Sequence, residues 1–347
     1  LHRLIRRQRQ MCIRDSPLGT YGPLPKEMEE KANEQLDNFA KILESRGIRV
    51  DRPIPLDFSQ KVQTPDWVQD SMFGCMPPRD VLLTVGNEIL EATMSFRSRW
   101  FEYLCYRPLL EQYFKEDPGF RLEAAPKPRL TERSYREDFW KEWGSLSEEQ
   151  KYERAEKSDW ILTEQEPLFD AADVVRFGKD LFVQKSMVTN DAGIDWLRRH
   201  YPDHRIHRVR YRELTPSHMD TTLVPLRPGL VIFNPVRTPL EKAQRELFEN
   251  NGWEIIEGPK SVLDKKMPMS FCSLWLNLNI LVLDPKTVCV EASETPVIEL
   301  LDKHGFEVIP IPFYDVSPFG GGLHCGSADV HREGICEDYL PKQVEGF

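Results

Sequence analysis

The sequence predicts one α/β domain built from a repeated unit of helix, strand and hairpin. Two observations support this fold class: amphipathic helices lead directly into short apolar strands, and strand pairs joined by tight turns recur between them. The unit recurs about every 50 residues, a period typical of a propeller or a cyclic array of βαβ-type modules. An ordinary α/β domain is the alternative. A single cyclic domain is favoured over the two domains that a length of 347 residues suggests.

The step from helix to strand is expected four times. Each predicted helix has apolar residues at helical spacing and ends just before an apolar strand. Three of the four helices are followed by glycine, which favours the left-handed conformation that ends a helix. The expected pairs are 29–45 with 47–50, 194–201 with 206–211, 239–250 with 252–256, and 296–304 with 305–309.

Four hairpins are expected from paired apolar runs. Their turns contain Gly-Asn, Gly-Lys, Pro-Gly or Asp-Pro, which suit tight connections. The expected strand pairs are 81–85 with 88–92, 174–177 with 180–184, 221–225 with 230–233, and 280–283 with 288–291. A last strand-like segment covers 320–325. A helical insertion rich in charged and aromatic side chains is expected near 129–165.

The composition argues against several classes of protein. The chain has 46 lysines and arginines against 56 aspartates and glutamates, so its net charge is −10 and no basic face for nucleic acid is expected. No apolar run approaches the roughly 18 residues of a membrane span. The seven cysteines form no CxxC pair, which argues against a zinc ribbon or redox motif and favours a reduced, cytoplasmic protein. A mitochondrial location is the alternative for a eukaryotic source.

The two ends of the chain differ in character. The first fourteen residues contain five arginines and no acid, as a transit peptide would. We expect residues 1–16 instead to be a fragmentary, non-native segment. The predicted domain therefore comprises residues 17–347, with a polar C-terminus that looks complete.

The run Gly320–Cys325 is the first candidate for chemistry. Its three glycines permit close backbone approach, and a reactive cysteine needs a cationic or histidine neighbour that lowers the thiol pKa. A phosphate-binding loop is not supported, because neither GxGxxG nor Gly-Lys-Ser/Thr follows. A glycine-rich bend with a buried cysteine is the structural alternative.

Two motifs contain acids that could serve such a nucleophile. In Ser217–Asp220, histidine and aspartate lie two residues apart at the start of an expected strand and would point to the same side, as a general acid–base beside a carboxylate requires. Further ligands for a metal site are not found. In Glu166–Asp173, three acids precede a hairpin and could orient a histidine or hold a cation. Surface residues and capping carboxylates are the alternatives.

Two further motifs lie beside expected hairpins. Met76–Asp80 precedes the first hairpin, and Asn234–Arg237 follows the third. Arg237 could hold a carboxylate in a bidentate fork. Each motif could also be a solvated surface segment. Because all candidates lie at the ends of hairpin strands, a ring of modules would bring them together on one axis.

Together and in this order, the motifs resemble those of the amidinotransferases, the family of the glycine and inosamine-phosphate amidinotransferases. The resemblance rests on Glu166–Asp173, His218–Asp220 and Gly320–Cys325, with further matches at 86–92, 97–102 and 125–128. It runs from about residue 47 to about residue 340. It implies the five-bladed pseudo-symmetric α/β propeller called the pentein fold, shared with arginine deiminases. The family's first strand is not found, so an incomplete first blade is expected.

The resemblance also implies roles for single residues. Cys325 corresponds to the nucleophile, His218 to the acid–base, and Asp170 to the carboxylate grouped with that histidine. The substrate-binding residues implied are Asp80 and Asp220 for the guanidinium, Arg237 for the substrate carboxylate and Ser273 in the pocket wall.

Several positions depart from the pattern of the glycine enzymes. Phe73 stands where a tyrosine is expected, and Cys272 stands in place of a serine. Thr215 and Ser217 replace asparagine and methionine, and the residues that follow the nucleophile, 326–328, also differ. The sequence therefore keeps the residues implied in the bond-making steps, but it differs at positions implied in recognition of the substrate. Glycine, an amino-cyclitol or another amine therefore remain open as acceptors.

The resemblance implies transfer of the amidino group of L-arginine to an acceptor amine through an amidino-cysteine, with release of L-ornithine. No metal or organic cofactor is expected. The expected partners are small-molecule substrates, without nucleic acid, and a homodimer is compatible with the family. Two alternatives stay open: an arginine deiminase-like hydrolase, if water reaches the intermediate, and a non-catalytic protein that binds guanidino compounds.

Overall fold

The computed structural model describes residues 5–8, 20–270 and 272–347. Strand β1 (Ile5–Gln8) pairs with β2 (Thr20–Pro23) in a two-stranded antiparallel sheet. The rest of the segment 1–16, which we predicted to be non-native, lies outside the described residues.

Four three-stranded sheets share one topology. In each, two strands form an antiparallel hairpin, a helix follows, and the third strand returns parallel to the second. The first unit contains β5 (Leu82–Val85), β6 (Glu88–Glu91), α3 (Tyr103–Glu116) and β7 (Arg121–Ala124), and the second contains β8 (Val174–Phe177), β9 (Asp180–Gln184), α6 (Asp191–His200) and β10 (Arg205–Val209). The third unit contains β11 (Leu223–Arg227), β12 (Leu230–Phe233), α7 (Lys242–Asn250) and β13 (Glu254–Glu257). The fourth unit contains β14 (Leu281–Asp284), β15 (Thr287–Glu291), α8 (Thr295–Lys303) and β16 (Glu307–Ile311).

The remaining elements connect or cover these units. They are α1 (Lys26–Ser45), β3 (Val62–Gln63), β4 (Val68–Gln69), α2 (Pro78–Val81), α4 (Phe139–Ser145) and α5 (Glu148–Glu156), with the short 3₁₀ helices η1 (Arg97–Arg99), η2 (Glu132–Ser134), η3 (Ala171–Asp173), η4 (Leu274–Leu278) and η5 (Tyr314–Phe319). None of the helices in the described ranges combines the length and apolar character that crossing a membrane requires.

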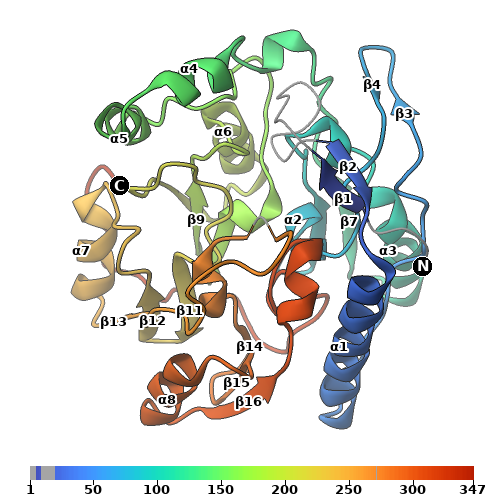
Figure 1. Ribbon diagram of the computed structural model, residues 1–347. Coiled ribbons are helices and arrows are strands. Elements are labelled where there is room, and N and C mark those ends of the chain that lie inside the picture. The colour runs from blue at the N-terminus through green and yellow to red at the C-terminus, as the bar shows by residue number, and fades with distance from the viewer. Residues whose placement is uncertain (1–4, 9–19, 271) are drawn as a thin grey trace.

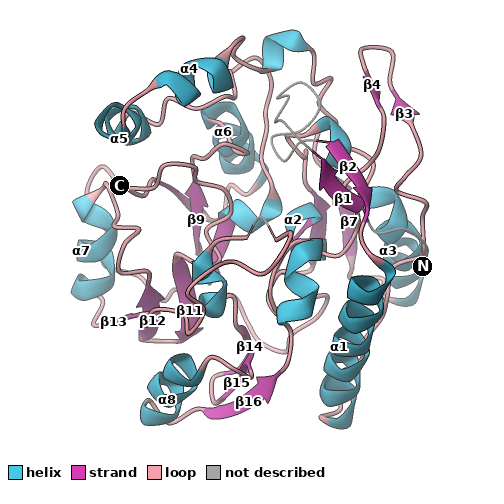
Figure 2. Cartoon of the chain, in the orientation of Figure 1, coloured by secondary structure: helices cyan, strands magenta, loops and turns pink. Residues whose placement is uncertain are grey.

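The sheets lie around a common centre with the helices outside them. Figure 1 shows α6, α7, α8, α1 and α3 at the periphery, and α2 near the middle. Figure 2 shows the same arrangement, with β9 and β11 inside the outer helices and the pair β3 and β4 at the edge. The predicted α/β class and the repeated unit are confirmed, with four complete units among the described residues.

The core is divided into clusters between neighbouring elements. Phe248 of α7 is fully buried, and its ring stacks on Phe182 of β9 with centroids 5.4 Å apart. It also contacts Phe177 of β8, so the second and third units share one core. Phe39 of α1 meets Phe313 at 5.3 Å and covers the fourth unit. Packing between units, and not only within them, therefore fixes how the strand ends meet.

Glycine ends three of the helices as predicted. The φ angles of Gly47, Gly252 and Gly305 are 79°, 72° and 79°, in the left-handed region that residues with a side chain rarely enter. The four predicted hairpins and the helices at the four predicted positions are present, with ends shifted by a few residues. Local chemistry is sufficient for these elements, because turn and cap preferences act within one segment.

Three expectations about elements were wrong or incomplete. Residues 48–50 and 320–325 form no strand; the second segment is a turn after η5. We also missed α3 and β7, the second half of the first unit. Pro108 lies inside α3, and the exposed side chains of Leu104 and Phe114 blur its apolar stripe. Tertiary packing overrides both signals.

Candidate active site

The candidate site is built from segments that directly precede the first strand of each unit. Asp80 lies in α2 before β5, Asp170 precedes η3 and β8, and Asp220 lies before β11. Asn279 precedes β14 in the fourth unit. Because the four strands begin around the same centre, side chains far apart in the sequence come into contact there, as the following hydrogen bonds show.

Cys325 lies buried in a network with Asn279 and Asp220. Its backbone N–H donates to Oδ1 of Asn279 (2.9 Å), whose Nδ2 donates to Sγ of Cys325 (3.2 Å) and to Oδ2 of Asp220 (2.8 Å). The thiol itself donates to Oδ2 of Asp220 (3.3 Å). Burial, and then the negative charges of Asp220 and Asp80, raise the pKa of the Cys325 thiol well above its ordinary value. The thiol is therefore protonated when no cation occupies the site.

His218 lies between two carboxylates. Its Nε2 is 3.1 Å from Oδ2 of Asp170, and its Nδ1 is 3.6 Å from Oδ1 of Asp80. Burial acts to lower the pKa of His218, but Asp80 and Asp170 outweigh it and raise the pKa to about 10. The φ angle of His218 is 60°, a left-handed conformation that is uncommon for a residue other than glycine. The site therefore holds an imidazolium in a strained turn.

Only one of the two oxygens of the Asp80 carboxylate forms a hydrogen bond among the described residues. Its Oδ2 accepts a hydrogen bond from Nη1 of Arg99 (2.8 Å), and Arg99 is held in turn by Glu102 and lies over the ring of Phe73, 4.9 Å from its centroid. Oδ1 of Asp80 is buried and has no hydrogen-bond partner among the described residues. Burial raises the pKa of Asp80. An unsatisfied buried oxygen beside a cysteine network is a place for a cationic donor group.

Asp220 is ionised despite its burial. Its Oδ2 accepts from Nδ1 of His324 (2.8 Å) as well as from Asn279 and Cys325. Burial alone would raise the pKa of Asp220, but the hydrogen bond from His324 and the positive charge of His218 hold it well below its usual range. For His324, burial and the charge of Arg79 lower the pKa to about 4. His324 is thus a neutral donor at neutral pH.

Arg237 forms a second polar cluster, which includes the two threonines that follow Asp220 in the chain. Its Nη1 donates to the hydroxyls of Thr221 (2.8 Å) and Thr222 (3.1 Å), and its Nη2 donates to Oγ of Ser273 (3.1 Å). Oε1 of Glu213 pairs with Nη2 of Arg237 at 2.8 Å. Burial raises the pKa of Glu213 to about 7, although Arg237 opposes it. The fork that we predicted to bind a substrate carboxylate thus already faces a partly buried acid of the chain.

The three glycines before the cysteine leave room for this network. A Cβ on Gly321 would lie 2.6 Å from Sγ of Cys325, and a Cβ on Gly322 would lie 2.9 Å from Cβ of Asn279. Gly320 has φ 132°, a conformation that side chains rarely allow. The glycine run is therefore required both by the backbone and by the closeness of the cysteine.

The structure gathers the predicted residues in two groups. One contains Cys325, Asp220, His218, Asp170 and Asp80, and the other contains Arg237 and Ser273. One expectation about their geometry was wrong. His218 and Asp220 lie in a turn before β11 and not in a strand, so they face different partners, Asp170 and Cys325.

Other acids of the predicted motifs have structural roles. Glu166 accepts hydrogen bonds from the backbone N–H groups of Arg129 and Leu130, and Asp173 accepts from the hydroxyls of Ser186 and Thr189. No group of three or more histidine, cysteine or acidic side chains in the described ranges is arranged to hold a metal ion.

Sequence reasoning missed Asn279, Arg99 and Glu213. Asn279 was within reach, because it precedes the first strand of its unit, as Asp80 and Asp220 do. Arg99 lies in the matched segment 97–102, but we assigned no role to it, and Glu213 gave no comparable signal. Their partners, Asp80 and Arg237, come from other segments of the chain.

Comparison with known proteins identifies the class to which this fold and site belong. The mitochondrial glycine amidinotransferase of Gallus gallus is 40% identical over 317 residues, which cover 91% of this chain and 73% of that protein. The L-arginine:L-lysine amidinotransferase of Pseudomonas savastanoi pv. phaseolicola is 41% identical over 92% of this chain and 83% of that protein. The chain therefore belongs to the amidinotransferase family. No protein-family model matches it.

Solved structures agree with this assignment. An amidinotransferase of the saxitoxin biosynthetic pathway from Microseira wollei superposes with a TM-score of 0.82 at 39% identity, covering 91% of this chain and 88% of that chain. The N-terminal domain of a cyanobacterial arginine dihydrolase superposes with a TM-score of 0.56 at 14% identity, covering 87% of each chain. The second likeness shows a shared fold alone.

Proposed function

We propose that the protein transfers the amidino group of L-arginine to an acceptor amine through a covalent amidino-cysteine, and that it releases L-ornithine. The observation that supports this most directly is the placement of the Cys325 thiol and the His218 imidazolium among the carboxylates of Asp80, Asp170 and Asp220. A planar cation with several N–H donors is the ligand that such carboxylates bind best. The family's relatives named above act on L-arginine or are named for amidino transfer.

The raised thiol pKa supports a role for the donor in activating Cys325. A guanidinium beside Asp80 and Asp220 would neutralise the charges that keep the thiol protonated. The thiol then loses its proton to solvent, and the thiolate attacks the guanidinium carbon. The C–S bond forms and the C–N bond to ornithine breaks. His218 gives a proton to the departing nitrogen, so that ornithine leaves as an amine.

The second half of the reaction reverses these steps with another amine. Neutral His218 takes a proton from the acceptor nitrogen as that nitrogen attacks the amidino carbon. The C–S bond breaks and returns the thiolate. Asp170 supports the charged form of His218 in each half-reaction, because it lies 3.1 Å from Nε2. Arg237 and Ser273 are proposed to hold the carboxylate of the donor, in exchange for Glu213.

Incubation with L-arginine alone tests the first half-reaction. We expect the intact mass of the chain to rise by one amidino group, the adduct to map to Cys325, and one equivalent of ornithine to appear. Cys325→Ser should abolish the adduct. Cys336→Ser is the matched control, because this cysteine is exposed and lies outside the network.

Other outcomes would replace the proposal. Continuous release of citrulline would identify the hydrolase alternative, because water would then be the acceptor. Binding of arginine with neither adduct nor ornithine would identify a non-catalytic binder. If the adduct forms, a panel of glycine, L-lysine and an amino-cyclitol identifies the acceptor; glycine and L-lysine occur in the names of the two relatives.

We further propose that the four units belong to a five-bladed propeller, with α1 as part of the fifth blade. Support comes from the cyclic arrangement of the sheets and from α1 packing beside the fourth unit. A homodimer and the absence of nucleic-acid partners remain predictions. So does a cytoplasmic location, beside the mitochondrial one for which the chicken relative is named.

A further inference from the structure

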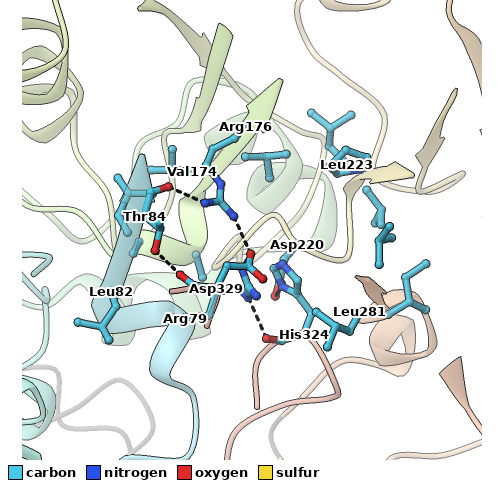
Figure 3. Close-up of a pocket in the computed structure, with 18 of the residues that line it drawn as sticks. Arg79, Leu82, Thr84, Val174, Arg176, Asp220, Leu223, Leu281, His324 and Asp329 are labelled. Atoms are coloured by element: carbon cyan, nitrogen blue, oxygen red, sulfur yellow. Dashed lines mark hydrogen bonds and ion pairs between the residues drawn. The ribbon is translucent and has the colours of Figure 1, made fainter. Parts of the chain in front are cut away.

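A cavity of about 250 Å³ lies behind the nucleophile, between the first strands of the four units. Apolar side chains from these strands line it, among them Leu82, Val174, Leu223 and Leu281 (Figure 3). Asp220 and His324 line it on the side of Cys325. The cavity shares Asp220 with the site described above, but Asp80, His218 and Arg237 are not among its lining residues, so most of this space lies outside that site.

Three arginines gather around one carboxylate in the same cavity. Asp329 accepts hydrogen bonds from Nη1 of Arg79 (3.3 Å), Nη2 of Arg176 (3.0 Å) and Nη2 of Arg332 (2.9 Å). Figure 3 shows Arg79, Arg176 and Asp329 grouped at the cavity. Three guanidinium groups and one carboxylate give this cluster a formal charge of +2. The cluster therefore has the electrostatic character of an anion site.

Arg79 also has a free donor there. The residue is only 8% exposed, and its Nε donates to the backbone oxygen of His324 (2.9 Å). Its Nη2 is buried and has no hydrogen-bond partner within the described ranges. Leaving a charged N–H group buried without an acceptor is costly, so a ligand that supplies an acceptor is favoured at this point.

We propose that the cavity binds a small aliphatic monocarboxylate. The head group accepts from Nη2 of Arg79 and gains from the excess positive charge, because guanidinium and carboxylate pair in complementary geometry. The aliphatic part lies against the apolar strand residues, since an apolar lining beside a cationic cluster suits such a ligand. Asp220 also lines the cavity, and its negative charge disfavours a carboxylate beside it, so the head group is directed toward the arginines.

The arginine cluster also offers a route from solvent. The side chains of Arg176 and Arg332 are 33% and 45% exposed, whereas Asp329 between them is 15% exposed. Arg332 donates to the backbone oxygens of Val282 and Leu283 near the end of β14. A ligand could therefore enter past these two arginines without passing through the catalytic network.

Calorimetric titration of the whole chain with sodium butyrate, without arginine, tests this proposal. We expect one site per chain, with chloride at the same ionic strength binding at least 10-fold more weakly. Val282→Phe fills the cavity, and Arg332→Gln removes one cation at its exposed end; each should weaken butyrate binding at least 10-fold. Arg237→Gln is the matched control, because it removes the predicted carboxylate site for the donor and should leave butyrate affinity unchanged. Thermal unfolding of each variant reports whether it folds.

Three results would overturn the proposal. The first is no saturable binding at about 10 mM butyrate. The second is binding that Arg237→Gln abolishes and folded Val282→Phe retains, which would place butyrate in the donor site. The third is equal affinity for chloride and butyrate. Because the titration requires no turnover, it succeeds or fails independently of the proposed amidino transfer.

Discussion

Replacing Asp170 by asparagine would measure how far one carboxylate keeps His218 protonated. Asp170 is 0% exposed, and its Oδ2 lies 3.1 Å from Nε2 of His218. With an effective dielectric constant of about 20, two unit charges at this separation attract by about 5 kcal/mol, equivalent to about 4 pKa units. The amide can still form a hydrogen bond, and Asp80 keeps its charge. We therefore expect the His218 pKa to fall from about 10 by roughly 2–4 units.

Loss of the His218 proton in Asp170→Asn should slow the departure of ornithine. In the unmodified chain, His218 stays protonated until the pH approaches about 10, so the rate of ornithine release should not change with pH in the neutral range. In Asp170→Asn the rate should decline as the pH rises through the lowered pKa. At pH near 8 a His218 pKa of about 6–8 leaves between about 1% and 50% of the imidazole protonated, so the rate should fall by about 2- to 100-fold. Nitrogen NMR of the imidazole gives the pKa, and rapid quenching gives the rate.

Asp173→Asn is the matched control for this experiment. Asp173 is in the same short helix region, is equally buried, and bonds to Ser186 and Thr189 and not to His218. It should lower the His218 pKa by less than about one unit, since its charge acts from a greater distance. An unchanged His218 pKa in Asp170→Asn, or equal rate losses in both variants, would refute the assignment of this role to Asp170.

Two further predictions concern Cys325, the proposed nucleophile. Because the charge of Asp220 raises the pKa of the Cys325 thiol, Asp220→Asn should lower that pKa and speed alkylation of Cys325 by iodoacetamide at pH near 8 by about 10-fold. The control Asp338→Asn should leave the rate unchanged. Slower alkylation in Asp220→Asn would show that Asp220 does not raise the thiol pKa. Gly321→Ala places a Cβ 2.6 Å from Sγ of Cys325, so formation of the amidino adduct should become about 100-fold slower. The control Gly144→Ala should retain activity, because a Cβ at Gly144 has no atom within 4 Å. Unchanged adduct formation in Gly321→Ala would show that the cysteine network tolerates displacement.

Local sequence signals predicted the elements well where each element depends on its own residues. The hairpin turn between β8 and β9 and the glycine ends of α7 and α8 follow from turn and cap chemistry. The same reasoning failed for α3, where Pro108 and exposed apolar side chains mislead a purely local analysis. It also failed for 320–325, because an apolar, glycine-rich run suits a strand as well as the turn that packs against Asn279.

The sequence motifs provided candidate residues for chemistry but not the geometry of these residues. The order of the motifs led to Cys325, His218 and Asp170 through a family resemblance. The direction in which His218 points depends on a left-handed turn, and its partners come from two other units. Asn279 and Glu213 were missed because no short motif marks a side chain whose role depends on a contact across the domain.

What the sequence determined by itself is the repeated α/β unit, the family and a set of candidate reactive side chains, because these depend on local pattern and residue type. What only the tertiary structure decided is the state of those side chains. Burial and carboxylates from separate units together raise the pKa of the Cys325 thiol, whereas for His218 the carboxylates raise the pKa against the effect of burial. Electrostatic energy depends on distance in space and on exclusion of water, and neither can be read from positions along a chain.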